Sequence, residues 1–352
     1  MTIGSSTAQR APAPPGWHHR RVIARRLGII AALAGLAALA TLASLAFGSN
    51  HLSIAAVADA LLHPGSSEAS TIVLGVRIPR TLLGILVGVC LGVAGAVMQG
   101  HTRNPLADPG LFGVSAGAGL AVVIGVYVFG VVGTGLDVWF ALAGAVIASI
   151  AVFSITAAGS GTASPVPLAL AGAAVSALLE AFTSYIVLAD KDSLQAYRLW
   201  VVGSLSGRDA DVIWSVLPFA AAGLLLAFVN TRALDNLGLG SEMARSLGEN
   251  VLVARIVGLG SITLLTAAAT AAAGPIGFIG LVTPHLARPL VGTNHRFLLP
   301  ACALLGVSLV LAADVIGRLI GGVGEVQVGI VLALIGGPFF VAVARRRSLA
   351  AL

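Results

Sequence analysis

The chain is built from repeated apolar runs, most of them close to 20 residues long, separated by short polar segments. About 20 apolar residues in helical conformation cross the hydrocarbon core of a bilayer. The runs are rich in Gly and Ala and show no alternation of polar and apolar residues, which indicates helices and not a membrane β-barrel. With charged residues at only 10% and a mean hydropathy of +1.00, a soluble domain could not cover its surface. The sequence therefore predicts an all-α polytopic membrane protein.

About ten transmembrane helices are expected. Their approximate bounds are 27–47, 81–101, 113–133, 138–158, 166–189, 212–230, 253–273, 276–292, 297–314 and 326–344. The first run is longer than the apolar core of a signal peptide, which has about 7–15 residues, so we interpret it as an uncleaved span. Residues 1–26 are basic and rich in Pro, Ala and Ser, which is typical of a disordered cytoplasmic tail. Residues 27–347 are then one ten-helix transmembrane domain.

The arginines predict the orientation of these spans, because Lys and Arg concentrate in cytoplasmic loops. With the N-terminus inside, most arginines fall on the cytoplasmic side and both termini are cytoplasmic. The basic residues are spread over loops with few aromatic residues near them, which does not suit a nucleic-acid partner. Against this bias, Arg77 and Arg80 lie in an outer segment beside Pro79, and Arg318 lies in another.

The inner segment 231–252 is long enough to form structure of its own. Ser241 is a suitable N-cap and Gly248 a suitable C-terminal stop for a short helix, with Met243, Ala244 and Leu247 expected on one face. An exposed amphipathic helix of this kind needs a surface to pack against. A protein partner and the lipid headgroups are the two alternatives. On the outer side, short helices are expected within 48–76 and 190–211.

No catalytic or cofactor motif is present in the sequence. A P-loop needs a lysine after a glycine-rich turn, but Lys191 is the sole lysine and is followed by Asp192, so the chain does not hydrolyse ATP through such a loop. Cys90 and Cys302 lie in apolar runs and are predicted to be small buried side chains without a metal. We expect a transport component and not an enzyme, with no cofactor.

One acidic residue, Glu180, lies well inside an expected span, and Asp314 lies at an outer end. Glu180 either lines a water-filled passage or bonds to a neighbouring helix. Acidic residues inside membrane helices are found in ion pathways, so an ion-coupled secondary transporter is the alternative class.

Four blocks of the sequence resemble the permease subunits of binding-protein-dependent ABC importers for ferric siderophores, haem and vitamin B12. The resemblance extends from about Leu27 to the C-terminus. The blocks are RIPRTLLGILVGVCLGVAGAVMQGHTRNPLADPGLFGVSAGAG (77–119), NLGLGSEMARSLG (236–248), GPIGFIGLVTPHLARPLVGTNHRFLLP (274–300) and AADVIGRLI with GEVQVGI (312–330). One position departs from the pattern, because Gln327 stands where the family usually has proline, and this puts the bend after Glu325 in doubt.

The resemblance implies a type II ABC importer permease. Such a subunit pairs with a second permease, identical or paralogous, with two cytoplasmic ATPase subunits, and with an extracytoplasmic substrate-binding protein or lipoprotein. The expected location is the bacterial cytoplasmic (inner) membrane. The expected cargo is a ferric siderophore, with haem and vitamin B12 as alternatives.

The resemblance also assigns roles to residues. Arg77, Arg80 and Arg318 match arginines that receive carboxylates of the binding protein. Thr162 and Ser164 fall where the passage narrows at its cytoplasmic end. Glu180 is a further candidate for the pathway, from its position inside a span and not from the resemblance. The residues that match the ATPase-coupling loop are Leu239, Gly240, Glu242, Ala244, Arg245, Leu247 and Gly248.

Overall fold

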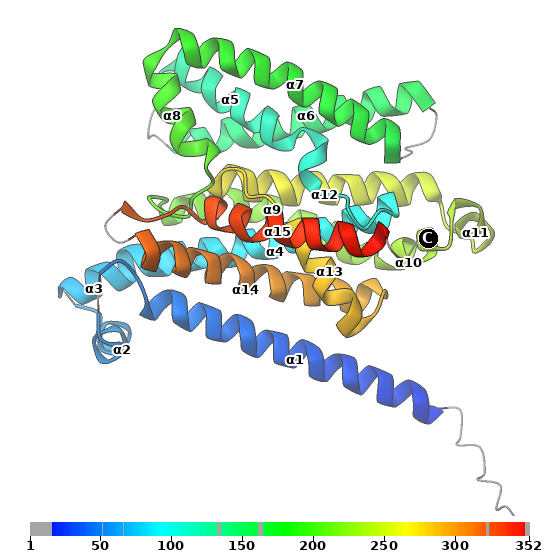
Figure 1. Ribbon diagram of the computed structural model, residues 1–352, viewed down its shortest axis with the longest axis horizontal. Helices are drawn as coiled ribbons and strands as arrows, with labels where there is room; N and C mark the ends of the chain where they lie inside the picture. The colour runs from blue at the N-terminus through cyan, green and yellow to red at the C-terminus, as the bar shows by residue number, and fades with distance from the viewer. Residues whose placement is uncertain are drawn as a thin grey trace, which may run out of the picture.

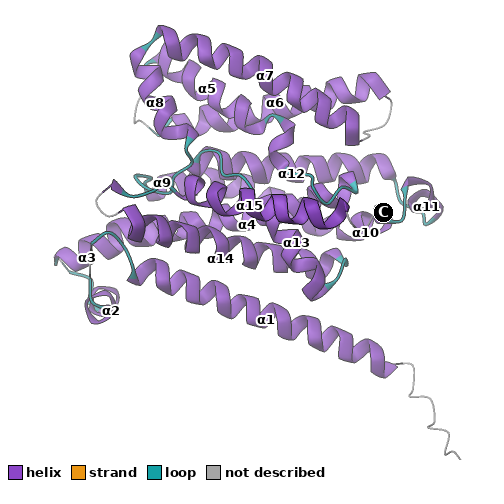
Figure 2. Cartoon of the chain, viewed as in Figure 1, coloured by secondary structure: helices purple, strands orange, loops and turns teal. Residues whose placement is uncertain are grey.

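The computed structural model describes residues 16–50, 52–65, 67–131, 135–160, 165–321 and 324–348. In these ranges the regular structure is helical, and no strand is drawn (Figure 2). Seven helices within them are long and apolar enough to cross a membrane, and two shorter apolar helices, Val114–Phe129 and Val328–Ala342, accompany these seven. The prediction of an all-helical protein with several apolar spans is confirmed.

Each expected span coincides with a helix. These helices are α1 (Gly16–Ala46), α4 (Ile78–Thr102), α5 (Val114–Phe129), α6 (Asp137–Ser160), α7 (Pro165–Ala189), α9 (Ala210–Val229), α12 (Val251–Ala273), α13 (Ile279–Val291), α14 (His295–Gly321) and α15 (Val328–Ser348). Helix α13 is short and contains Pro284 and Pro289. Helix α1 begins at Gly16, so part of the expected disordered tail is helical, since its Arg-rich segment favours helix and contains no proline. Residues 1–15 of that tail lie outside the described residues.

Short helices connect the spans. They are α2 (Ile54–Leu62), α3 (Glu68–Ile72), α8 (Lys191–Val201), α10 (Thr231–Gly238) and α11 (Ser241–Ser246), with a π-helical turn Val73–Arg77 and a 3-10 turn Pro109–Phe112. Helices α2 and α8 lie in the two segments, 48–76 and 190–211, where short helices were expected from the sequence. Ser53 caps α2, because its hydroxyl accepts a hydrogen bond from the Ala56 N–H at 3.1 Å.

The helices run roughly side by side, with short elements at both ends of the bundle (Figure 1). Helices α2, α3 and α8 lie at one end, here called the outer end. Helices α10 and α11 and the beginning of α1 lie at the opposite end, here called the inner end. The short helices at each end belong to loops that the arginine distribution assigned to the same side of the membrane.

Helix α4 occupies the centre of the bundle. In the span Glu68–Thr102, 78% of the most apolar window is buried, against 17% in α1 and in α7. Close packing depends on glycine where α4 crosses α14, because a Cβ on Gly88 would lie 2.6 Å from the backbone of Gly306. Small residues at helix crossings let backbones approach in this way. Helices α1 and α7 instead leave broad apolar faces open.

Candidate functional site

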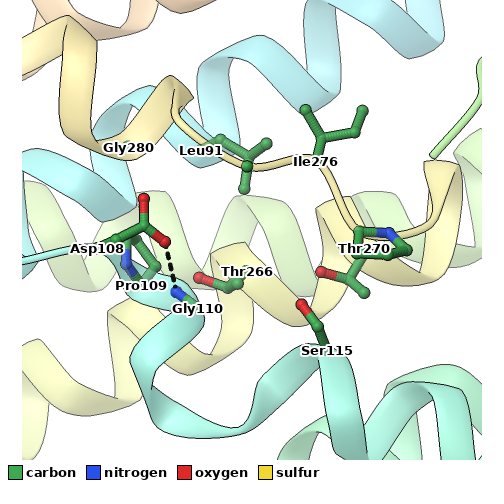
Figure 3. Close-up of a pocket in the computed structure, with 11 residues that line it drawn as sticks. Leu91, Asp108, Pro109, Gly110, Ser115, Thr266, Thr270, Ile276 and Gly280 are labelled. Carbon is green, nitrogen blue, oxygen red and sulfur yellow. Dashed lines mark hydrogen bonds between the residues drawn. The ribbon is translucent and has the colours of Figure 1, made fainter. Parts of the chain in front are cut away.

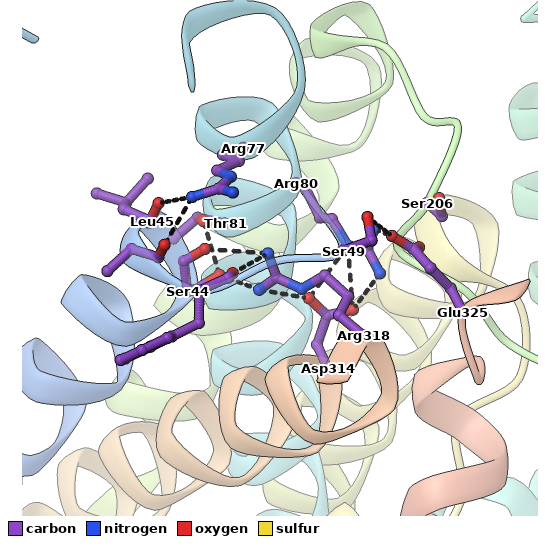
Figure 4. A network of polar contacts seen from close by, with 12 residues as sticks. Ser44, Leu45, Ser49, Arg77, Arg80, Thr81, Ser206, Asp314, Arg318 and Glu325 are labelled. Carbon is purple, nitrogen blue, oxygen red and sulfur yellow. Dashed lines mark hydrogen bonds and ion pairs between the residues drawn. The ribbon is translucent and has the colours of Figure 1, made fainter. Parts of the chain in front are cut away.

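The structure brings Arg77, Arg80 and Arg318 together at the outer end (Figure 4). Arg77 ends the π-helical turn, Arg80 lies in the first turn of α4, and Arg318 lies near the end of α14. The chain stays helical from Arg77 to Arg80, although Pro79 lies between them. The missing N–H of proline is accommodated where the π-helical turn passes into α4. The three residues are only 3%, 6% and 3% exposed.

Arg80 is paired with two acidic residues of this chain. Its Nε lies 3.1 Å from both carboxylate oxygens of Asp314, its Nη2 lies 2.8 Å from Asp314 Oδ1, and its Nη1 donates to Glu325 at 2.8 Å. Asp314, which is 1% exposed, also pairs with Arg318 at 3.1 Å. Two arginines therefore share this carboxylate, which leaves little charge for an ion-binding role of Asp314.

The other two arginines close the C-terminal end of α1. Arg77 donates to the carbonyl oxygens of Leu45, Ala46 and Asn50 at 2.7, 2.7 and 2.6 Å. Arg318 donates to the carbonyl oxygens of Ser44 and Phe47 at 3.1 and 2.8 Å, and to the Ser44 hydroxyl at 3.0 Å. The last carbonyls of a helix lack intrahelical partners and carry partial negative charge, so guanidinium groups satisfy them well. The sequence reasoning did not anticipate this capping role.

A hollow of about 120 Å³ opens beside these groups. All three arginines line it together with Glu325, and its other lining residues are Gly48, Ser49, Asn50, Ile72 and Val76. The Glu325 side chain is 25% exposed. Burial alone would raise the pKa of Glu325, but the hydrogen bond from Arg80 and its charge outweigh burial, so the pKa lies below its usual value. An internal carboxylate therefore already faces the arginines, and their pairing with a partner's carboxylates stays a prediction.

At the inner end, α11 and the residues that flank it present three large apolar side chains to the surface. Leu239, Met243 and Leu247 are 66%, 52% and 51% exposed, and Glu242 and Arg245 are exposed beside them. We call Leu239, Met243 and Leu247 the inner apolar patch. The exposed face differs from the expected one at one residue, because Ala244 is fully buried. It packs against Leu237, Val251 and Ala254.

Two glycines fix the ends of α11. Gly240, with φ +108°, is the N-cap in place of the expected Ser241, because glycine alone adopts this conformation without strain. Gly248 follows the last turn with φ +84°, and its N–H donates to Arg245 O at 2.9 Å while Glu249 N–H donates to Ala244 O at 3.0 Å. This is a Schellman ending, as expected for Gly248.

The remaining pathway candidates are Thr162, Ser164 and Glu180. Thr162 and Ser164 lie outside the described residues. Glu180 is exposed on α7, among exposed large side chains that include Leu178, Phe182 and Tyr185. A carboxylate on an open apolar helix face is costly in lipid, so this face needs a cover of protein or water.

A second cavity of about 120 Å³ lies between α4, α5, α12 and the segment before α13, and the sequence reasoning missed it (Figure 3). Asp108 lines it beside Ser115, Thr266 and Thr270, and Asp108 Oδ1 accepts from Gly110 N–H at 2.8 Å. The available signal was the polar segment NPLADPG in the middle of apolar sequence. Among the described residues no group of three His, Cys, Asp or Glu side chains is placed to hold a metal.

Known proteins are similar to this chain over nearly its whole length. The FecCD transport family matches residues 36–346. The ferric enterobactin transport system permease protein FepD of Escherichia coli is 44% identical over 98% of both chains. The Fe(3+)-citrate import system permease protein YfmD of Bacillus subtilis is 40% identical over 85% of this chain and 89% of its own.

A solved structure has the same fold. It is an inward-facing conformation of a metal-chelate type ABC transporter, with a TM-score of 0.77 and 26% identity, over 91% of this chain and 99% of the other. The four sequence blocks, the helical bundle and these matches agree, and the chain belongs to the FecCD transport family.

Proposed function

We propose that this protein is the permease subunit of a type II ABC importer that carries a ferric siderophore across the bacterial cytoplasmic membrane. The ten spans follow the helices α1, α4–α7, α9 and α12–α15, with both termini in the cytoplasm. The family match over residues 36–346 carries the proposal. The two relatives described above are named for ferric enterobactin and ferric citrate, which favours a ferric chelate over the alternatives haem and vitamin B12.

A second permease subunit, identical or paralogous, covers the open face of α7 in this proposal. Glu180 and the exposed side chains around it then line or flank the pathway and no longer face lipid. Thr162 and Ser164, which lie outside the described residues, are the proposed gate. A polar lining without tight contacts suits a passage whose selectivity resides in a separate binding protein.

The ATPase subunits bind at the inner end. The inner apolar patch, with Glu242 and Arg245 at its side, provides the contact, and Gly240 and Gly248 give α11 its shape. The sequence contains no P-loop, so ATP hydrolysis would need another chain. The inner apolar patch consists of only three side chains, and binding to a headgroup surface scales with the apolar area buried, so the patch favours a protein partner.

The binding protein docks at the outer end in this proposal. One of its carboxylates enters the hollow lined by Arg77, Arg80 and Arg318 and competes with Glu325 for Arg80. Guanidinium–carboxylate pairs fix orientation as well as adding attraction.

Replacement of Glu325 by glutamine tests this docking mode. We expect the binding protein to bind about fivefold more tightly, because the internal competitor for Arg80 loses its charge and a charge pair with a partly exposed carboxylate contributes about 1 kcal/mol. Affinity would be measured in nanodiscs at two salt concentrations. Asp137→Asn is the matched control, since Asp137 pairs with Arg208 at 2.8 Å and is similarly exposed. Unchanged affinity and salt dependence in Glu325→Gln would reject docking on Arg80.

Uptake by proteoliposomes tests the function as a whole. Vesicles containing the permease with its ATPase subunits and binding protein should accumulate a ⁵⁵Fe-labelled siderophore only when ATP is supplied on the ATPase side. Vesicles with the permease alone should accumulate none, with or without an ion gradient. Gradient-driven uptake by the permease alone would favour the secondary transporter and overturn the proposal.

A further inference from the structure

A cavity of about 220 Å³ lies at the inner end, between the beginning of α1 and the end of α13. The two helices are in contact, and α1 runs along the edge of the bundle (Figure 1). The lining residues are Val22, Arg25, Arg26, Arg288, Pro289, Leu290, Val291 and Gly292. None of the roles proposed above uses this cavity.

Three arginines converge on the cavity, and its lining contains no acidic residue. Arg25 is exposed, while Arg26 and Arg288 are half-buried. The Arg26 guanidinium lies over the ring of Phe297 at 5.2 Å from the centroid, a cation–π contact that holds it in place. A Cβ at Gly292, which has φ +88°, would lie 2.9 Å from Arg26 Nη2. Glycine at this position therefore leaves room for the guanidinium.

The apolar part of the cavity wall, which includes Val22 and Leu290, continues into exposed apolar surface. Val22 and Leu27 on α1 are 48% and 55% exposed, and Leu286 and Leu290 on α13 are 36% and 42% exposed. After Arg26, α1 carries no further charged residue, and exposed apolar side chains such as Leu36 and Leu39 continue along it. The arginines therefore lie where the hydrocarbon region ends, at the depth of phospholipid phosphates.

We propose that this cavity binds an anionic phospholipid, with the phosphate held by Arg25, Arg26 and Arg288. The acyl chains lie along the apolar surfaces of α1 and α13. Arginine presents several N–H donors in one plane and suits phosphate oxygens. A basic pocket between transmembrane helices at the headgroup level selects anionic over zwitterionic lipid. The proposal requires only that the protein lies in a bilayer, so it does not depend on the identity of the transported solute.

Lipid retention by the purified permease tests the proposal. The protein would be exchanged into micelles containing equal amounts of phosphatidylglycerol and phosphatidylcholine, and bound lipid would be counted by native mass spectrometry. We expect the wild type to retain phosphatidylglycerol. Arg25→Gln/Arg26→Gln should bind it about 25-fold more weakly, at roughly fivefold per arginine. Arg232→Gln, which removes an exposed inner-end arginine outside the cavity, should bind like the wild type.

A single variant and a soluble-anion control separate lipid binding from a folding defect and from binding of free phosphate. Arg25→Gln alone changes an exposed side chain and should weaken binding about fivefold without any effect on folding. Glycerol 3-phosphate or inorganic phosphate should not raise the melting temperature as phosphatidylglycerol does. Equal retention of both lipids, or equal phosphatidylglycerol binding by the wild type and the double variant, would overturn the proposal. Full stabilisation by free phosphate would assign the site to a soluble anion and overturn it equally.

Discussion

Arg80→Gln is expected to destabilise the protein by about 3 kcal/mol. The substitution leaves Asp314, which is 1% exposed, with Arg318 as its remaining cationic partner. Breaking a buried ion pair by removing one partner costs about 3–5 kcal/mol, and the contact with Arg318 places the effect at the lower end. The free energy of unfolding would be compared through thermal and denaturant unfolding in a fixed detergent.

Two variants show whether the pair itself is responsible. Arg198→Gln removes an exposed arginine at the same end of the molecule and should leave stability unchanged. The double variant Arg80→Gln/Asp314→Asn should lose less stability than the sum of the two single variants, because both changes break the same ion pair. If Arg80→Gln were no less stable than Arg198→Gln, the buried network would not stabilise the outer end.

Met243→Gln/Leu247→Gln is expected to abolish ATP-driven transport while the permease remains folded. Both side chains belong to the inner apolar patch and are about half exposed, so the substitutions remove no core packing. Burying a Leu or Met side chain in an interface contributes about 1.5–3 kcal/mol. Losing both should weaken ATPase binding about 100-fold or more. Binding of the purified ATPase and stimulation of its hydrolysis rate would be measured in nanodiscs.

Leu62→Gln is the control for this experiment. Leu62 is 75% exposed on α2, at the opposite end of the bundle, so the same chemical change there should leave ATPase binding intact. Normal ATPase affinity in Met243→Gln/Leu247→Gln would show that α11 does not carry the contact. Ala244→Leu should behave differently from both, because Ala244 is fully buried and the larger side chain would disturb the packing of α11.

The outer arginines have structural roles that restrict how they can meet a partner. Arg77 and Arg318 hold the end of α1, so neither is free to turn outward without uncapping that helix. Arg80 differs, because one of its partners, Glu325, lies in the short segment before α15 and is partly exposed. A docking protein can therefore replace Glu325 with its own carboxylate at Arg80 without uncapping α1.

The long apolar segments could be located from the sequence because the conformation of each depends only on its own residues. A run of about 20 apolar residues must be helical in lipid, where every backbone group needs an internal partner. Gly248 was predictable for the same reason, since a helix stop depends on a few adjacent residues. Gln327 does not prevent the break before α15, because its carbonyl accepts from the N–H groups of Ile330 and Val331 at 3.0 and 3.3 Å.

The sequence by itself determined the helical membrane class, the approximate spans, the ends that the loops occupy and the family. These properties follow from hydropathy, charge and short motifs, which are local. Only the tertiary structure decided that Arg80 meets Asp314 and Glu325, that Ala244 faces inward while Met243 and Leu247 face out, and that Arg26 shares a cavity with Arg288. Each of these depends on residues distant in sequence, whose approach is set by helix packing and not by any pattern along the chain.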